Sequence, residues 1–185
     1  MGEFNRIYKG DLTDRQIIAF WRQVENSGRS RKIGFDCPPF SAEGFCHFMR
    51  REDVHPWWIT FRNEPIGLFF LTDCIGKTAQ AHFVTLPQGV RRTRNKRISV
   101  VVGFGLYALG KALWERNVSG GFLLDTLIGV VPMCNKDAVK FTASIGGTNS
   151  GLVPGACYFH DTGENVPGVV MAFTRENIGE WATEL

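Results

Sequence analysis

Two groups of residues in the 185-residue chain have types and spacing that suit the binding of a polar ligand. Asn135 follows an apolar run that ends at Pro132 and precedes a segment with helical periodicity, so it stands at a predicted helix start. The free backbone N–H groups of such a start hold polar ligands, and a carboxamide both donates and accepts hydrogen bonds. The second group is the basic segment 91–97, with five positive charges in seven residues. It favours a phosphate-bearing ligand, a nucleic-acid or acidic-protein contact, or a solvated surface loop.

Asp125 is a carboxylate within a predicted apolar strand. Burial raises the pKa of a carboxyl group unless a partner compensates its charge, so Asp125 either binds a neighbouring loop or takes part in catalysis. The five cysteines form no CxxC pair, and the spacing of the histidines is not that of metal ligands. Neither a disulfide framework nor a metal site is therefore predicted.

The segment 121–147 must position Asn135. Its apolar residues between 122 and 131 predict a central strand buried on both faces, which Pro132 ends. A helix from Asn135 follows, because apolar residues recur at helical spacing as far as Ile145. Gly146 and Gly147 supply the left-handed positions that finish a helix.

The rest of the chain alternates between helical and strand patterns. Thr13 and Gln16 have the spacing of a capping box, a second helix begins at Ser41, and residues 98–117 have helical periodicity. Strands are predicted at 3–8, 57–62, 66–72, 79–86, 151–160 and 167–175, with a turn at 63–65. We therefore expect a mixed α/β (α+β) fold in one domain over residues 1–185, with a crossover helix between central strands.

Composition narrows the class of protein. With 44% hydrophobic and 21% charged residues the chain is typical of a soluble globular protein. The net charge is +3, and −2 without the basic segment, so its basic character is local. We expect a cytoplasmic protein without a signal peptide, because the cysteines suit a reducing compartment and the first residues lack an apolar core. The longest apolar stretch is shorter than the ~20 residues of a membrane span, so none is expected.

The segment 131–147 resembles the V-P-x-x-N-x-x-A-x-x-F-x-x-x-x-G-[FG] segment of the GNAT superfamily of N-acetyltransferases. His82-Phe83-Val84 is similar to an I-H-F strand in phage-associated and bacterial members. The order of elements matches over nearly the whole chain. The resemblance implies a central, mostly antiparallel mixed sheet of about six to seven strands flanked by about four helices.

The resemblance also implies an enzyme that moves an acetyl group from acetyl-coenzyme A to a primary amine of a protein or small molecule. Two central strands would splay apart to admit the pantetheine arm, and Asn135 would hold its amide. The implied cofactor-binding residues are Val84, Thr85, Leu86, Arg92, Thr93, Arg94, Asn95, Lys96, Arg97, Asn135 and Phe141. The segment 92–97 would hold the pyrophosphate by charge-assisted hydrogen bonds.

The chain departs from this family at two places. Asn95 and Arg97 stand where the phosphate loop has Gly, and Thr142 replaces a Tyr that often protonates the leaving thiolate. Tyr158 is then a candidate acid. His82 is the candidate base, since its pKa lies near the operating pH, or else a packed strand histidine.

These departures motivate an alternative from another class. The chain would then be a catalytically silent binding protein of GNAT fold, whose segment 91–97 contacts nucleic acid or a partner protein. The segment contains few aromatic residues, which argues against a single-strand platform. The sequence indicates neither the acceptor amine nor the oligomeric state.

Overall fold

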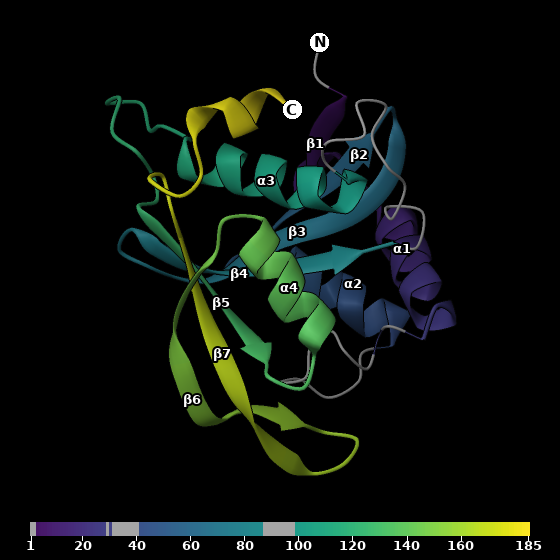
Figure 1. Cartoon of the computed structure of the whole chain (residues 1–185). Helices are drawn as coiled ribbons and strands as arrows, with labels where there is room; N and C mark the ends of the chain where they lie inside the picture. The colour runs from purple at the N-terminus through teal and green to yellow at the C-terminus, as the bar shows by residue number, and fades with distance from the viewer. Residues whose placement is uncertain (1–2, 29, 31–40, 87–98) are drawn as a thin grey trace.

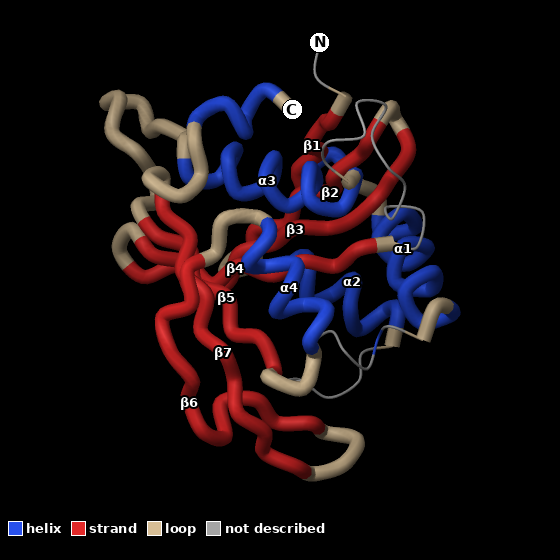
Figure 2. The backbone as a smooth tube through the Cα atoms, in the orientation of Figure 1, coloured by secondary structure: helices blue, strands red, loops and turns tan. Residues whose placement is uncertain are grey.

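The structure is a computed structural model, and it describes residues 3–28, 30, 41–86 and 99–185. Within these ranges seven strands form one sheet in the order β1-β2-β3-β4-β5-β7-β6, with four α-helices around it (Figures 1 and 2). The strands are β1 Phe4–Tyr8, β2 His55–Phe61, β3 Glu64–Ile75, β4 Thr78–Thr85, β5 Thr126–Pro132, β6 Thr148–Phe159 and β7 Glu164–Thr174. The helices are α1 Asp14–Asn26, α2 Ala42–Arg50, α3 Val100–Leu113 and α4 Lys136–Ser144, with 3-10 turns at Lys9–Asp11 and Glu180–Glu184. The predicted mixed α/β architecture is confirmed.

The sheet separates two hydrophobic cores. Helices α3 and α4 lie on one face of the sheet, and α1 and α2 lie on the other (Figure 1). Successive side chains of a strand point to opposite faces, and β3 illustrates this. Leu68 and Phe70 pack with α1 and α2, whereas Phe69 and Leu71 pack with α3. Each face of the central strands is therefore covered by a different helix pair, which places α4 on the same side as α3.

Local sequence determines where the helices begin. The predicted capping box of α1 is present, because the Thr13 side chain accepts a hydrogen bond from Gln16 N and the Gln16 side chain accepts one from Thr13 N. Ser41 caps α2 in the predicted position. No helix of the described ranges is long and apolar enough to cross a membrane.

Helix α3 is the crossover between β4 and β5, and most of its residues are buried. Gly105 allows α4 to pack closely against it. A Cβ at this position would lie 2.8 Å from Ile145 Cγ2 and 2.9 Å from Phe141 Cζ. This contact fixes α4, and with it Phe141, against the sheet.

Two predicted boundaries were wrong. The strand predicted at 122–131 begins at Thr126, because Phe122 instead packs beneath the guanidinium groups of Arg116 and Arg175. It is buried on alternate residues rather than on both faces, since it leaves β4 after three residue pairs. The helix predicted to reach 117 ends at Leu113, and Asn117 Oδ1 instead accepts hydrogen bonds within a local turn.

Two turn assignments also change. The hairpin between β2 and β3 turns at Arg62 and Asn63, whose φ angles are 52° and 66°, as in a type I′ turn. Glu64 and Pro65 already belong to β3. After α4 the left-handed residue is Gly146, with φ of 88°. Gly147 is needed for space instead, because a Cβ there would lie 2.7 Å from Thr142 O.

Candidate active site

The site is the gap that opens where β4 and β5 part. These parallel strands pair at three positions, from Thr78–Thr126 to Gln80–Ile128, and no further pair is found between them in the described residues. A cavity of ≈ 360 Å³ lies beyond this point. Residues 80–84 of β4 and 129–132 of β5 line it, together with side chains of α1, α2, β3 and α4. The splay expected from the resemblance is therefore present.

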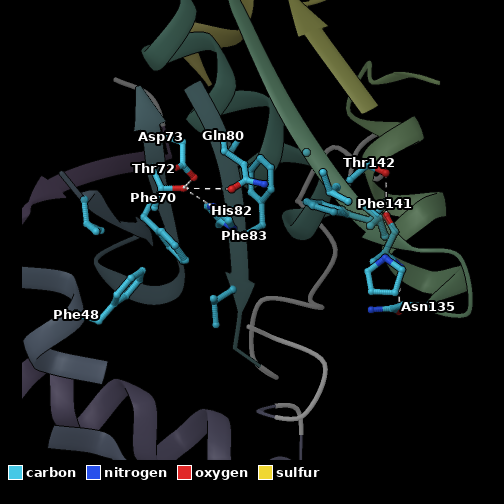
Figure 3. A pocket seen from close by; sticks show the side chains of 18 of the residues that line it. Phe48, Phe70, Thr72, Asp73, Gln80, His82, Phe83, Asn135, Phe141 and Thr142 are labelled. Atoms are coloured by element: carbon cyan, nitrogen blue, oxygen red, sulfur yellow. Dashed lines mark hydrogen bonds between the residues drawn. The ribbon is translucent and has the colours of Figure 1, made fainter. Parts of the chain in front are cut away.

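Asn135 lies at the edge of the cavity, at the start of α4 (Figure 3). Its Oδ1 accepts a hydrogen bond of 3.3 Å from Ala138 N, so the side chain caps the helix. Within the described residues no hydrogen bond from Asn135 Nδ2 is found, which leaves this N–H₂ group able to donate to a carbonyl group in the cavity.

Phe141 forms the wall of the cavity on the α3 and α4 face of the sheet. Its ring meets Phe83 of β4 edge to face, with centroids 5.4 Å apart. Phe83 contacts Phe104 of α3 in the same manner, at 5.8 Å. Three interlocked rings thus give this side of the gap a rigid apolar surface.

The register of β4 shows which backbone groups face the gap. Leu86 N donates to Ile66 O at 2.9 Å, so Leu86 and Val84 direct their backbone polar groups toward β3. The backbone N–H and C=O groups of Phe83 and Thr85 therefore point toward the gap, on the side where β5 has diverged from β4. Of the predicted residues Val84, Thr85 and Leu86, the register favours Thr85 for backbone contacts and adds Phe83. The side chain of Val84 still lines the cavity, while Leu86 is fully buried.

His82 lines the cavity on the opposite face, beside α1 and α2 (Figure 3). Its ring stacks on Phe70 with centroids 4.5 Å apart and planes inclined by 8°. His82 Nε2 lies 2.9 Å from Thr72 Oγ1. Burial lowers the pKa of His82 to about 4, against a smaller opposing effect of Asp73, so the imidazole is neutral at pH 7. The expectation that its pKa lies near the operating pH was therefore wrong, because burial disfavours the charged ring.

The structure does not bring the other two candidate catalytic residues to this cavity. Asp125 precedes β5 and pairs with Arg175, at 2.6 Å between Oδ1 and Nη2, and with Lys77 at 3.7 Å. The Arg175 hydrogen bond lowers the pKa of the Asp125 carboxyl, as expected where a partner compensates the charge. Tyr158 is 37% exposed on β6, and its ring contacts His160. Neither lines the cavity.

Thr142, which replaces the family's tyrosine, is buried. Its hydroxyl lies 3.0 Å from both Ala138 O and Val139 O, so it is bonded within its own helix. The predicted phosphate-binding residues Arg92, Thr93, Arg94, Asn95, Lys96 and Arg97 lie outside the described residues. Their role stays a prediction.

Sequence analysis missed Phe70, Thr72, Asp73 and Gln80, which line the cavity beside His82. The i, i+2 spacing of Gln80 and His82 could have placed them on one face of a strand. The alignment of Thr72 with Gln80 depends on the β3–β4 register, which the sequence does not fix. The described residues contain no group of three or more His, Cys, Asp or Glu side chains that could hold a metal ion.

No protein-family model and no curated protein sequence matches the chain. Among solved structures, it is similar to spermidine N-acetyltransferase from Vibrio cholerae, crystallised in complex with CoA and spermine. The two share 14% identity over 95% of this chain and 98% of that one, with a TM-score of 0.69.

Two further solved structures resemble the chain. One is an acetyl transferase from Salmonella typhimurium that modifies the N-terminal serine of ribosomal protein L7/L12, with 13% identity over 93% of this chain and 95% of that one and a TM-score of 0.69. The other is the N-acetyltransferase PseH from Campylobacter jejuni, with 11% identity over 94% and 99% and a TM-score of 0.57. The chain therefore has the fold of the GNAT acetyltransferases, as its motif at 131–147 predicted.

Proposed function

We propose that the protein is an N-acetyltransferase that moves an acetyl group from acetyl-coenzyme A to a primary amine of a protein or small molecule. The observation that carries the proposal is the cavity between the splayed ends of β4 and β5, bordered by the Asn135-capped start of α4. The similar structures carry names of enzymes that acetylate spermidine or a protein N-terminus, and both acceptors are primary amines. They support the reaction class.

The described residues fit a pantetheine arm. Asn135 Nδ2 can donate to one of its amide carbonyls, and the backbone C=O of Phe83, which faces the gap, can accept a hydrogen bond from one of its amide N–H groups. The rings of Phe83 and Phe141 form an apolar wall against which the methylene groups can pack. Arginines of the segment 92–97 would hold the phosphate groups by charge-assisted hydrogen bonds.

Bound acetyl-coenzyme A supplies a thioester carbonyl that a neutral amine can attack. His82 accepts one proton from the acceptor ammonium, which frees the nitrogen lone pair. Attack forms the N–C bond, and the N–H of Phe83 stabilises the oxyanion. Collapse breaks the C–S bond, and the second nitrogen proton passes to the departing thiolate. This route needs no tyrosine acid, consistent with the bonded hydroxyl of Thr142.

Thermal unfolding with and without acetyl-coenzyme A tests the proposal. A ligand at about 100 times its Kd adds about 2.7 kcal/mol of stability, which raises the midpoint of a domain of this size by several degrees. We then expect release of the free thiol of coenzyme A when acceptor amines are added. An unchanged midpoint at millimolar acetyl-coenzyme A would overturn the proposal.

The silent binding protein is distinguished by a second titration. A contact made by the segment 91–97 with nucleic acid weakens steeply as salt rises. DNA binding with this salt dependence, combined with no response to acetyl-coenzyme A, would favour that function. No described residue supports it at present.

A further inference from the structure

Thr72 lies between His82 and an acidic side chain that the reaction above does not use. Its Oγ1 is 2.9 Å from His82 Nε2 and 3.0 Å from Asp73 Oδ2 (Figure 3). Gln80 Oε1 is also within 3.3 Å of the same hydroxyl. The hydroxyl is therefore the centre of a polar cluster on the cavity side of β3.

A bulge in β3 makes this arrangement possible. Neighbouring residues of a regular strand point to opposite faces, so Asp73 could not normally reach the hydroxyl of Thr72 from the same side. Here the register with β4 shifts between Thr72 and Ile75, and Asp73 has a left-handed φ of 49°. Bulges commonly redirect a side chain next to an active site.

Counting hydrogens determines the direction of each bond. A carboxylate only accepts hydrogen bonds, and a hydroxyl has one hydrogen to donate. If Thr72 donates its hydrogen to Asp73 Oδ2 or to Gln80 Oε1, then Thr72 Oγ1 must accept from His82, and the ring proton is on Nε2. Nδ1 is then the unprotonated nitrogen, and no hydrogen bond to it is found among the described residues.

We propose that Thr72 and Asp73 are positioning residues that hold His82 in the Nε2–H tautomer, so that Nδ1 is the atom that receives the acceptor's proton. The role of Nδ1 as proton acceptor rests on the proposed acetyl transfer, whereas the assignment of the Nε2–H tautomer is independent of it. The proton moves from the acceptor ammonium to Nδ1 and later returns to solvent. Nε2–H remains bonded to Thr72 throughout, and the charge of the imidazolium faces Asp73.

The surroundings leave Asp73 available for this task. Arg51 and Asp53, the other charged side chains that line the cavity in the described residues, pair with each other. Asp73 forms no ion pair in the same part of the chain. Its charge raises the pKa of His82 against the effect of burial, as expected for a group that stabilises the imidazolium. The stacked Phe70 fixes the plane of the ring.

Nitrogen-15 NMR of the histidine rings tests the tautomer without any turnover. The chain has four histidines, and His82→Gln identifies the signals of His82. At pH 7 we expect a neutral Nε2–H ring, and Thr72→Val should shift the tautomer ratio roughly fivefold to tenfold toward Nδ1–H by removing one hydrogen bond. A wild-type Nδ1–H ring, or an unchanged ratio in Thr72→Val, would overturn the proposal.

Variants of Asp73 separate its hydrogen bond from its charge. Asp73→Gly suits the left-handed φ and removes the nearer acceptor of the Thr72 hydroxyl, and Gln80→Leu removes the second, so the double variant should shift the tautomer ratio as Thr72→Val does. Asp73→Asn tolerates the same φ and keeps an acceptor oxygen, so it should retain the tautomer while lowering the pKa of His82. These substitutions also serve if Thr72→Val does not fold. A shifted tautomer ratio in Asp73→Asn, or an unchanged ratio in the double variant Asp73→Gly with Gln80→Leu, would contradict the assignment.

Kinetics link the tautomer to turnover. Thr72→Val should lower kcat roughly tenfold, within the contribution of general-base catalysis, with an unchanged KM for acetyl-coenzyme A. Thr72→Ser should restore kcat, because it returns the hydroxyl. Thr78→Val, in the same hairpin but outside the cavity, is the matched control. If His82→Gln leaves turnover unchanged, the base assignment fails, while the NMR result still decides the tautomer.

Discussion

On the α1 and α2 face of β4, His82 lies among groups that exchange protons, with Thr72 and Asp73 within one or two hydrogen bonds. On the α3 and α4 face, the next residue, Phe83, lies among rings and makes no side-chain hydrogen bond. Two consecutive residues of one strand thus face a polar side and an apolar side of the same gap. In the proposed reaction, the acceptor amine would be deprotonated on the polar side of the gap, and the cofactor arm would be held on the apolar side.

Replacing His82 should have the largest effect on turnover and should show whether the polar side of the gap acts independently of the apolar side. His82→Gln should lower kcat by about 100-fold or more, the usual contribution of a general base, while acetyl-coenzyme A binding stays unchanged. The pKa of His82 is lowered, so the unfolded chain binds more protons between pH 4 and 6.5, and native stability falls as pH drops through this range. The variant should lack this part of the pH dependence. Loss of cofactor binding would show that the sides are not independent.

The predicted phosphate contacts should affect only the cofactor side. Arg92→Ala combined with Arg94→Ala should weaken acetyl-coenzyme A binding about tenfold or more at low salt, since charge-assisted hydrogen bonds are lost. Calorimetric titration measures the affinity, and thermal unfolding without ligand should remain almost unchanged. A large loss of stability in the unliganded protein would instead mean that these arginines are structural.

Substitution of Asn135 should have a smaller effect, on both stability and cofactor binding, because this residue caps α4 and lies at the cavity. Asn135→Ala should cost about 1 kcal/mol of stability through loss of the cap. It should also weaken acetyl-coenzyme A binding by a factor of about 2 to 10, the value of one hydrogen bond. Ser41→Ala is the matched control, since Ser41 caps α2 outside the cavity. Equal affinities in the two variants would remove Asn135 from the cofactor site.

Asp125 should have the smallest effect, because it lies outside both sides of the gap. The pKa of Asp125 is lowered by Arg175, so its ion pairs contribute stability above the unfolded pKa of 3.8, and this contribution is lost as pH falls. Asp125→Asn should therefore lower the unfolding midpoint slightly at pH 7 and less at pH 3. A marked loss of turnover would return Asp125 to the list of catalytic candidates.

The sequence predicted those structural features that depend on residues close together in the chain. The Thr13–Gln16 capping box, the helix start at Asn135 and the strand predicted at 79–86 each involve residues a few positions apart, and the structure contains all three. The motif at 131–147 then led to the correct fold. Of the sheet topology the sequence predicted only a crossover helix between central strands, and in the structure α3 connects β4 and β5 in this way.

What the sequence did not predict depends on register between distant segments. The contact of Thr72 with His82 needs both the β3–β4 alignment and a bulge, and neither has a local pattern. The same is true of Asp125, whose partner Arg175 is fifty positions away. Val84 and Leu86 were expected to bind the cofactor at the gap. Alternate residues of β4 direct their backbone N–H and C=O groups to opposite sides, and those of Val84 and Leu86 face β3.

The short pairing of β4 with β5 has a consequence for the cooperativity of folding. Three residue pairs join the antiparallel group β1–β4 to the group β5–β7, so most hydrogen bonds of the sheet lie within one group or the other. Beyond these three pairs, the side of β4 that carries the backbone groups of Phe83 faces the gap instead of β5. A molecule that bridges Phe83 and Asn135 would act as an additional strand there, and its binding energy would couple the folding of the two groups.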